Sequence, residues 1–163
     1  GTKWSNYFDG SSYMYPDSAL NTAMGTGFAG NIISFEMWIY PTNFNGGSYG
    51  QAITGAYAAV AANGRWLIYL EKTAATTSKL NFSYTTGTGT QNDLASTASA
   101  ITQNQWNHIA VTVDATTSSS ATVKLFANGV LLNTFTSQNM STQTAYYRAA
   151  VIGGANSLSL IHI

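Results

Sequence analysis

Two stretches of the chain alternate apolar and polar residues with a period of two. Residues 33–41 read Ile-Ser-Phe-Glu-Met-Trp-Ile-Tyr-Pro, and residues 106–114 read Trp-Asn-His-Ile-Ala-Val-Thr-Val-Asp. Successive side chains of a β-strand point to opposite faces, so this pattern predicts strands with one face on a core and one wetter face. The wetter face of the first strand is expected to carry Ser34, Glu36, Trp38 and Tyr40. In the second strand, Trp106, His108 and Ala110 share one face.

Residues 123–132 contain two apolar runs joined by Asn128-Gly129. This dipeptide predicts a β-hairpin, because a type I′ turn needs positive φ at both central residues. Many short strands separated by turn-forming stretches are typical of an all-β, two-sheet antiparallel jelly-roll sandwich. Strands are expected at residues 7–8 with 13–15, 32–40, 51–54, 56–61, 65–70, 79–84, 106–113, 121–127, 130–135 and 149–152, and one helical turn at 18–24. The expected core comprises Phe35, Met37, Ile39, Leu67, Ile109, Val111, Val113, Val123 and Leu125.

The composition is that of one folded, neutral domain. Charged residues make up 7% of the 163 residues, and six basic residues balance six acidic ones. This balance excludes the basic footprint of a nucleic-acid-binding protein or of one that binds anionic membranes. Solubility is expected to come from 22 Thr, 17 Ser and 14 Asn residues, while 45% hydrophobic content argues against disorder. Without cysteine there is no disulfide and no thiolate metal site, and no apolar run is long enough for a membrane helix.

The order and spacing of several motifs resemble the concanavalin A-like lectin/glucanase superfamily, in its laminin G-like, pentraxin-related branch. The resemblance runs from Tyr-Phe-Asp-Gly-Ser-Ser-Tyr-Met at residues 7–14, through the segments quoted above, to Val-Ile-Gly-Gly at residues 151–154. It implies a jelly roll used as a binding or adhesion module on a secreted or surface protein. Pentraxins join the two alternating strands by a disulfide, and the motif alignment places Glu36 and Ala110 at the bridged positions. The resemblance therefore implies that Glu36 and Ala110 are cross-strand neighbours, with a contact between Glu36 and His108.

The last six residues depart from the family pattern. After residues 151–154, the resembled family continues into a closing strand that pairs with the first strand of the chain. Here the chain ends in Leu-Ser-Leu-Ile-His-Ile, which is the translation of a transposon end used in sequencing libraries. We therefore expect a laminin G-like domain at residues 1–157 that lacks its closing strand, and a non-native tail at residues 158–163 of an environmental sequence fragment. The alternative is a genuine short apolar strand.

Catalytic chemistry is not predicted. The enzymes of the resembled superfamily carry paired carboxylates on one strand, because glycoside hydrolysis needs a nucleophile and an acid/base. This chain has two Glu residues, Glu36 and Glu71, and neither shares a strand with a second carboxylate. His108 alone cannot form a His-based zinc cluster. Calcium is conceivable, because relatives bind it through carboxylates, and Asn92-Asp93 in the expected loop 85–105 could contribute ligands. A surface turn explains that pair better, so no cofactor and no metal are expected.

Aromatic residues are the remaining binding candidates. Trp38 and Tyr40 oppose the apolar face of their strand, and exposed aromatic rings stack on the CH faces of sugars. Trp66, Tyr69 and Tyr84 could also line a sheet face, although core packing is the more common role of such residues. Polar loops supply the other candidates: Asn45 in loop 43–49, and Asn92 and Asp93 in loop 85–105.

Two functions remain compatible with these features. The first is a non-catalytic carbohydrate-binding or adhesion module of a larger secreted or surface protein, whose partner is a glycan or a surface protein. The second is a structural or receptor-contact domain of a phage or virion appendage. Both place the protein outside the cell, on a cell surface or on a virion, without membrane insertion and next to other domains of a longer parent chain.

Overall fold

The computed structural model describes residues 7–8, 28–44, 50–56, 65–86, 89–141, 151–152 and 161–162. Its strands are β1 (Tyr7–Phe8), β2 (Ile32–Pro41), β3 (Gln51–Ala56), β4 (Trp66–Lys72), β5 (Thr77–Thr85), β6 (Gln91–Ala95), β7 (Ile101–Thr102), β8 (Asn107–Asp114), β9 (Ala121–Ala127), β10 (Val130–Gln138), β11 (Val151–Ile152) and β12 (Ile161–His162). A 3-10 turn, η1 (Ser118–Ser120), precedes β9. Among these residues no helix is long and apolar enough to cross a membrane.

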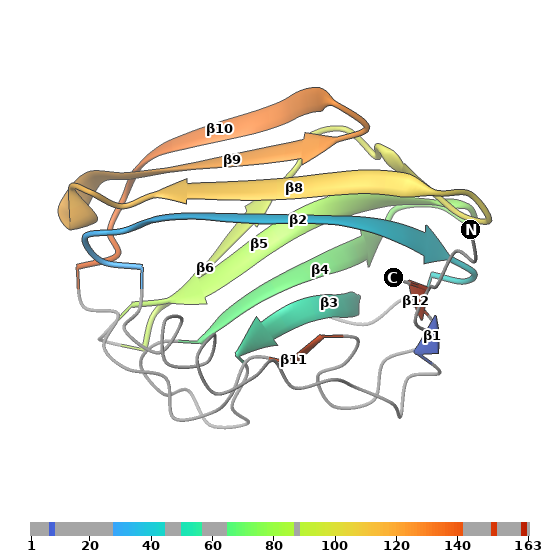
Figure 1. The fold of residues 1–163 in the computed structure, drawn as a ribbon, viewed down its shortest axis with the longest axis horizontal. Coiled ribbons are helices and arrows are strands. Elements are labelled where there is room, and N and C mark those ends of the chain that lie inside the picture. The colour runs from blue at the N-terminus through green and yellow to red at the C-terminus, as the bar shows by residue number, and fades with distance from the viewer. Residues whose placement is uncertain are drawn as a thin grey trace, which may run out of the picture.

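The strands form two antiparallel sheets that pack as a sandwich. The first sheet has the order β1-β12-β2-β8-β9-β10, and the second has the order β11-β3-β4-β5-β6, with β7 beside β5. Figure 1 shows β10, β9, β8 and β2 in one layer and β5, β4 and β3 in the other. The predicted all-β, two-sheet antiparallel jelly roll is therefore confirmed.

The two alternating stretches of the sequence lie side by side as β2 and β8. Their register places Glu36 opposite Ala110 and Trp38 opposite His108. The predicted cross-strand pair of Glu36 and Ala110 is confirmed. Because side chains alternate along both strands, one face of this pair carries buried apolar residues and the other carries the aromatic and polar ones.

The hairpin at Asn128-Gly129 also forms as predicted. The two residues have φ angles of 49° and 79°, and Val130 pairs with Ala127 on the preceding strand. Asn128 has a second role, because its side-chain Oδ1 accepts a hydrogen bond of 2.9 Å from the backbone N–H of His108. The turn thus continues the pairing of β9 with β8 up to the row that holds His108.

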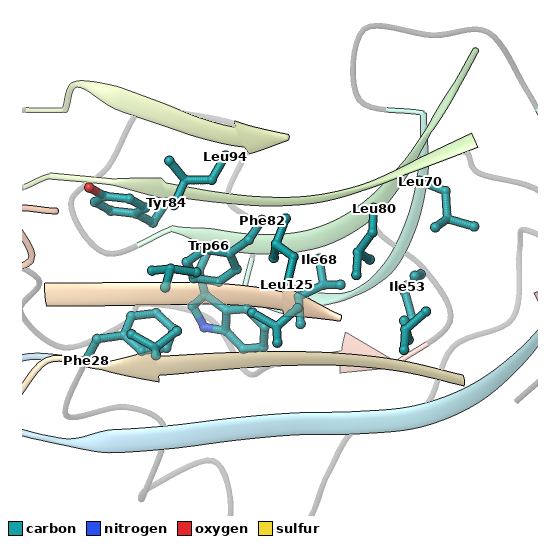
Figure 2. Close-up of a cluster of buried hydrophobic side chains, with 14 of the residues drawn as sticks. Phe28, Ile53, Trp66, Ile68, Leu70, Leu80, Phe82, Tyr84, Leu94 and Leu125 are labelled. Atoms are coloured by element: carbon teal, nitrogen blue, oxygen red, sulfur yellow. The ribbon is translucent and has the colours of Figure 1, made fainter. Parts of the chain in front are cut away.

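The core lies between the two sheets and is filled from both. The first sheet contributes Ile39, Ile109, Val111, Val113, Val123 and Leu125, all of them predicted and all buried. Phe35 and Met37 are half-buried and pack against this core. The second sheet contributes large side chains that Figure 2 shows in the buried cluster together with Leu125: Ile53, Trp66, Ile68, Leu80 and Phe82.

One core prediction and one loop prediction are wrong. Leu67 does not face the core but packs with Ala52 and Tyr69 in a separate buried cluster. The prediction failed because β4 is buried on both faces, so its sequence does not show which residues face the core. Residues 85–105, expected to be a long loop, contain the strands β6 and β7, which pair with β5. The predictions for residues 13–15, 18–24 and 57–61 lie outside the described residues.

The closing position of the first sheet is occupied by residues of the tail. β12 pairs with β1 through Tyr7 and Phe8, and with β2 through Tyr40 and Pro41. The sequence pattern predicted that this position would lack its closing strand, whereas here two residues of the segment 158–163 fill it. The β-branched Ile161 suits such a position. The origin of the tail stays a hypothesis.

Candidate functional site

Four ring-bearing side chains gather on the outer face of the first sheet, at one end of β2 and β8. They are Trp38, Tyr40, Trp106 and His108, called here the aromatic face. They alternate along the chain with Ile39 and Asn107, which are buried and point to the opposite side of the sheet. Trp38 is 57% exposed and Trp106 is 47% exposed. Two indoles are thus presented to solvent, one on β2 and the other in the turn directly before β8.

The rings of the aromatic face pair across the two strands. Trp38 lies over His108 with a ring-centroid distance of 5.0 Å and an interplanar angle of 52°. One row further, Tyr40 meets Trp106 edge-to-face at 5.5 Å and 67°. The four rings therefore form a two-by-two block in which the two exposed indoles occupy opposite corners. Contacts of this kind restrict the rotamers of both indoles, and restricted side chains lose less entropy on binding a ligand.

Glu36 adds a carboxylate next to this block. Its Oε1 lies 2.8 Å from Nε2 of His108, so the predicted contact between the two residues is confirmed. The Glu36 side chain is 71% exposed, whereas that of His108 is 22% exposed. The carboxylate therefore orients the imidazole beneath Trp38 while its oxygens remain open to hydroxyl donors in solvent.

A buried asparagine fixes the turn that carries Trp106. Asn107 donates from Nδ2 to the carbonyl oxygens of Thr102 (2.8 Å) and Gln105 (2.9 Å), and its Oδ1 accepts from the backbone N–H of Thr102 (3.1 Å). The same turn is tied to the end of β2, because the backbone N–H of Asn104 donates to the carbonyl of Pro41 at 2.8 Å. These bonds place Trp106 beside Tyr40.

Replacement of Asn107 by alanine is expected to lower the free energy of unfolding by about 2–4 kcal/mol, because three hydrogen bonds are lost and buried backbone groups are left unpaired. The turn should loosen as well, so the amide of Trp106 should exchange with solvent faster than in the parent protein. Urea denaturation and hydrogen exchange measure the two effects. Gln105→Ala, which keeps the backbone carbonyl, is the matched control. Unchanged exchange at residues 102–106 in Asn107→Ala would show that Asn107 does not hold the turn.

The predicted polar candidates do not join the aromatic face. Asn92 and Asp93 lie on β6 in the other sheet, where they pair with Tyr84 and Ser83. The Asp93 carboxylate accepts hydrogen bonds from Nε2 of Gln91 at 3.0 and 2.9 Å. The loop placement predicted for this pair is therefore wrong, and the Asp93 carboxylate is engaged by a neighbour on the edge strand β6. Asn45 lies outside the described residues.

The remaining aromatic candidates are buried, Trp66 and Tyr84 in the core and Tyr69 in the separate cluster with Leu67. Trp66, Tyr69 and Tyr84 are buried, so none of them presents a ring to solvent. Burial raises the pKa of Tyr84 above its ordinary value, and its hydroxyl donates to Oε1 of Gln138 at 3.0 Å across the sandwich. Sequence reasoning singled out Trp38 and Tyr40 but omitted Trp106 from the site. The signal was present, because Trp106 shares the face of His108 by alternation.

Metal-ligating side chains are scattered in the part of the chain that the structure describes. No group of three His, Asp or Glu residues there is arranged to hold an ion. The carboxylate of Asp114, at the end of β8, accepts hydrogen bonds from the hydroxyl and from the backbone N–H of Thr116. These two hydrogen bonds hold the pKa of Asp114 below its ordinary value. This carboxylate serves a turn, which is the ordinary role of Asp after a strand.

The comparisons place the chain in a superfamily. A laminin G-like family model, described as the concanavalin A-like lectin/glucanases superfamily, matches residues 8–159. The chain therefore belongs to the concanavalin A-like lectin/glucanases superfamily. No match was found among curated proteins.

Solved structures show the same fold at low sequence identity. Domain 4 of AbnA, an extracellular arabinanase from Geobacillus stearothermophilus solved with arabinotriose, is 16% identical, with a TM-score of 0.55 over 96% of this chain and 78% of that one. Botulinum neurotoxin type C, a toxin whose cell entry depends on two ganglioside molecules, is 14% identical. Its structure gives a TM-score of 0.57 over 97% of this chain and 36% of that one. The binding domain of botulinum neurotoxin DC, in complex with rat synaptotagmin II, is 12% identical, with a TM-score of 0.57 over 97% and 37%. The chain thus spans most of the arabinanase domain but little more than a third of either neurotoxin chain.

Proposed function

We propose that the chain is a non-catalytic carbohydrate-binding module of a larger exterior protein, and that its aromatic face holds the sugar. The observation that carries this proposal is the pair of exposed indoles, Trp38 on β2 and Trp106 directly before β8, each in contact with a neighbouring ring. Large aromatic side chains are rarely left exposed together without a function. A ring face suits the apolar CH face of a pyranose, and the polar atoms around it suit the hydroxyls.

The chemistry around the indoles supports sugar binding over catalysis. Glu36 is the one carboxylate on β2, and His108 is its hydrogen-bond partner. Glycoside hydrolysis by a pair of carboxylates needs a second acidic side chain at the bond to be cleaved. The arrangement can accept hydroxyl hydrogen bonds beside an aromatic surface, which is what a binding module requires. Two fold neighbours, one solved with arabinotriose and one dependent on gangliosides, agree with glycan binding as a use of this architecture.

A glycan array probed with the full chain tests the proposal, followed by calorimetry with Trp38→Ala. We expect the variant to bind its glycan about tenfold or more weakly, since truncating a central tryptophan of a binding site typically costs more than 1.4 kcal/mol. Trp38 is exposed, so the melting temperature should stay close to that of the parent. Equal glycan affinity of Trp38→Ala and the parent would show that the aromatic face is not part of the binding site.

Val130→Ala is the matched control. Val130 is a large apolar residue of the same sheet and is also exposed, but it lies on the edge strand β10 and pairs with the inward-facing Ala127. Its truncation should leave glycan affinity unchanged. A similar loss in both variants would indicate a nonspecific apolar contact rather than a sugar site.

A receptor-contact domain of a phage or virion appendage is the second candidate. Exposed Val130 and Leu131 at the start of β10 favour it, because exposed apolar residues on an edge strand suit a protein partner. A module of this kind would retain its partner in Trp38→Ala and lose it in Val130→Ala. The two variants together therefore separate the two functions.

A further inference from the structure

The two exposed indoles sit at opposite corners of the aromatic face. Trp38 is directly opposite His108, and Trp106 precedes His108 by two positions on the neighbouring strand. Diagonal neighbours of this kind have Cα atoms about 7–8 Å apart in an antiparallel pair. One pyranose ring covers one indole, so a ligand that uses both must extend across β2 and β8.

The fixed charge that the described residues place beside the aromatic face is negative. Among the described residues on this face, Glu36 is one row from Trp38 on the same strand. The described Lys residue on the outer face of this sheet is Lys124 on β9, which is the cross-strand neighbour of Thr112 on β8. Thr112 lies four residues beyond His108. Four residues of a strand span about 13 Å, which exceeds the screening length of physiological salt. The imidazole of His108 is already paired with Glu36 at 2.8 Å. An anionic sugar placed on the indoles would therefore meet the carboxylate of Glu36, with no Lys or Arg of the described residues beside it.

We propose that the ligand of the aromatic face is a neutral oligosaccharide of two or more residues, lying diagonally from Trp38 to Trp106 across β2 and β8. This inference rests on the proposed function and adds the charge and the length of the ligand. Each indole stacks on one sugar residue, and Glu36 accepts hydrogen bonds from the hydroxyls of the residue over Trp38. The His108 imidazole beneath Trp38 keeps that carboxylate in place through the 2.8 Å contact.

Calorimetric titration of the full chain tests the length requirement. The probes are oligosaccharides of glucose, galactose and arabinose, each from one to six residues long. We expect affinity to rise about tenfold or more between the monosaccharide and the trimer or tetramer of the series that binds, and then to level off. Trp38→Ala and Trp106→Ala should each flatten this rise. The melting temperature of both variants, followed by circular dichroism, serves as the folding control.

Oligogalacturonides of the same lengths test the charge requirement against the neutral galactose series. We expect them to bind about three- to tenfold more weakly, because like charges at this range repel. Glu36→Gln keeps the shape of the side chain and removes its charge, so it should narrow the difference between the two series. Equal affinity of the parent protein for the oligogalacturonides and for the neutral galactose oligosaccharides would overturn this part of the inference.

The outcomes separate the inference from the function on which it rests. Binding of a monosaccharide as tightly as its tetramer, or full affinity in Trp106→Ala, would defeat the diagonal ligand while leaving a sugar site at Trp38. Binding that persists in Trp38→Ala but fails in Trp106→Ala would also defeat it. Failure of every probe and of the glycan array would instead defeat the carbohydrate-binding function itself.

Discussion

Trp66→Ala is expected to lower the free energy of unfolding by about 3–5 kcal/mol, in contrast to the nearly neutral effect on stability expected of Trp38→Ala. Trp66 is 1% exposed and lies in the middle of the sandwich. Its ring is 6.0 Å from that of Phe28 in a T-shaped contact and 4.7 Å from that of Phe35. Truncation would leave a cavity next to the rings of Phe28 and Phe35, in a core where Figure 2 shows Trp66 among other large buried side chains. Such a cavity cannot collapse without moving strands.

Urea denaturation measured by circular dichroism checks this prediction, and Trp66→Phe guards against a variant that does not fold. The indole N–H of Trp66 is buried with no acceptor among the described residues, so phenylalanine removes both part of the ring and an unsatisfied donor. We therefore expect Trp66→Phe to cost less than half as much as Trp66→Ala. Equal stability of Trp66→Ala and the parent would mean that Trp66 does not occupy the core.

The different roles of these two tryptophans could be read only in part from the sequence. Trp38 sits in a strand with clear alternation, and its place on the wetter face follows from that pattern. Trp66 belongs to β4, where five consecutive residues are buried. Such a strand has no polar face to fix its phase, so the sequence assigned Leu67 to the core while Trp66, Ile68 and Leu70 fill it instead.

The central strands of the fold were easier to predict from the sequence than its edge strands. The resemblance to pentraxins implied the pairing of β2 with β8, including the pair of Glu36 and Ala110, and Asn128-Gly129 predicted the hairpin. β6 was missed because Gln91-Asn92-Asp93 is polar and reads as a turn. These residues form a strand because β5 offers them its backbone groups, which is a tertiary effect rather than a local preference.

The aromatic face shows the same limit on sequence reasoning. Trp38 was singled out from the alternation of its strand, whereas Trp106, which the same kind of alternation places on the face of His108, was not. What places Trp106 beside Tyr40 is the set of hydrogen bonds from Asn107, which joins residues that no periodic pattern connects. Such side-chain clamps depend on the folded geometry, and a single Asn in a sequence predicts no particular partner.

Gly50→Ala is expected to cost about 2–5 kcal/mol of stability, and Gly129→Ala no more than about 1–2 kcal/mol. Both glycines have positive φ, 48° and 79°, so both substitutions strain the backbone. They differ in their surroundings. A Cβ on Gly50 would overlap the carbonyl oxygen of Leu70 on β4, whereas one on Gly129 would meet no described atom within 4 Å.

Comparing the two variants by urea denaturation isolates the effect of that close approach from the effect of φ. Gly50 immediately precedes Gln51, which pairs with Leu70, so a side chain there would push β3 away from β4 at the start of their pairing. Backbone cannot give way as the end of a flexible side chain can, and the cost should therefore appear as lost stability rather than local rearrangement. Hydrogen exchange should quicken first at residues 51–52 and 69–70 in Gly50→Ala and stay unchanged there in Gly129→Ala. If the two variants lose the same stability, β3 does not approach β4 as closely as the structure places it.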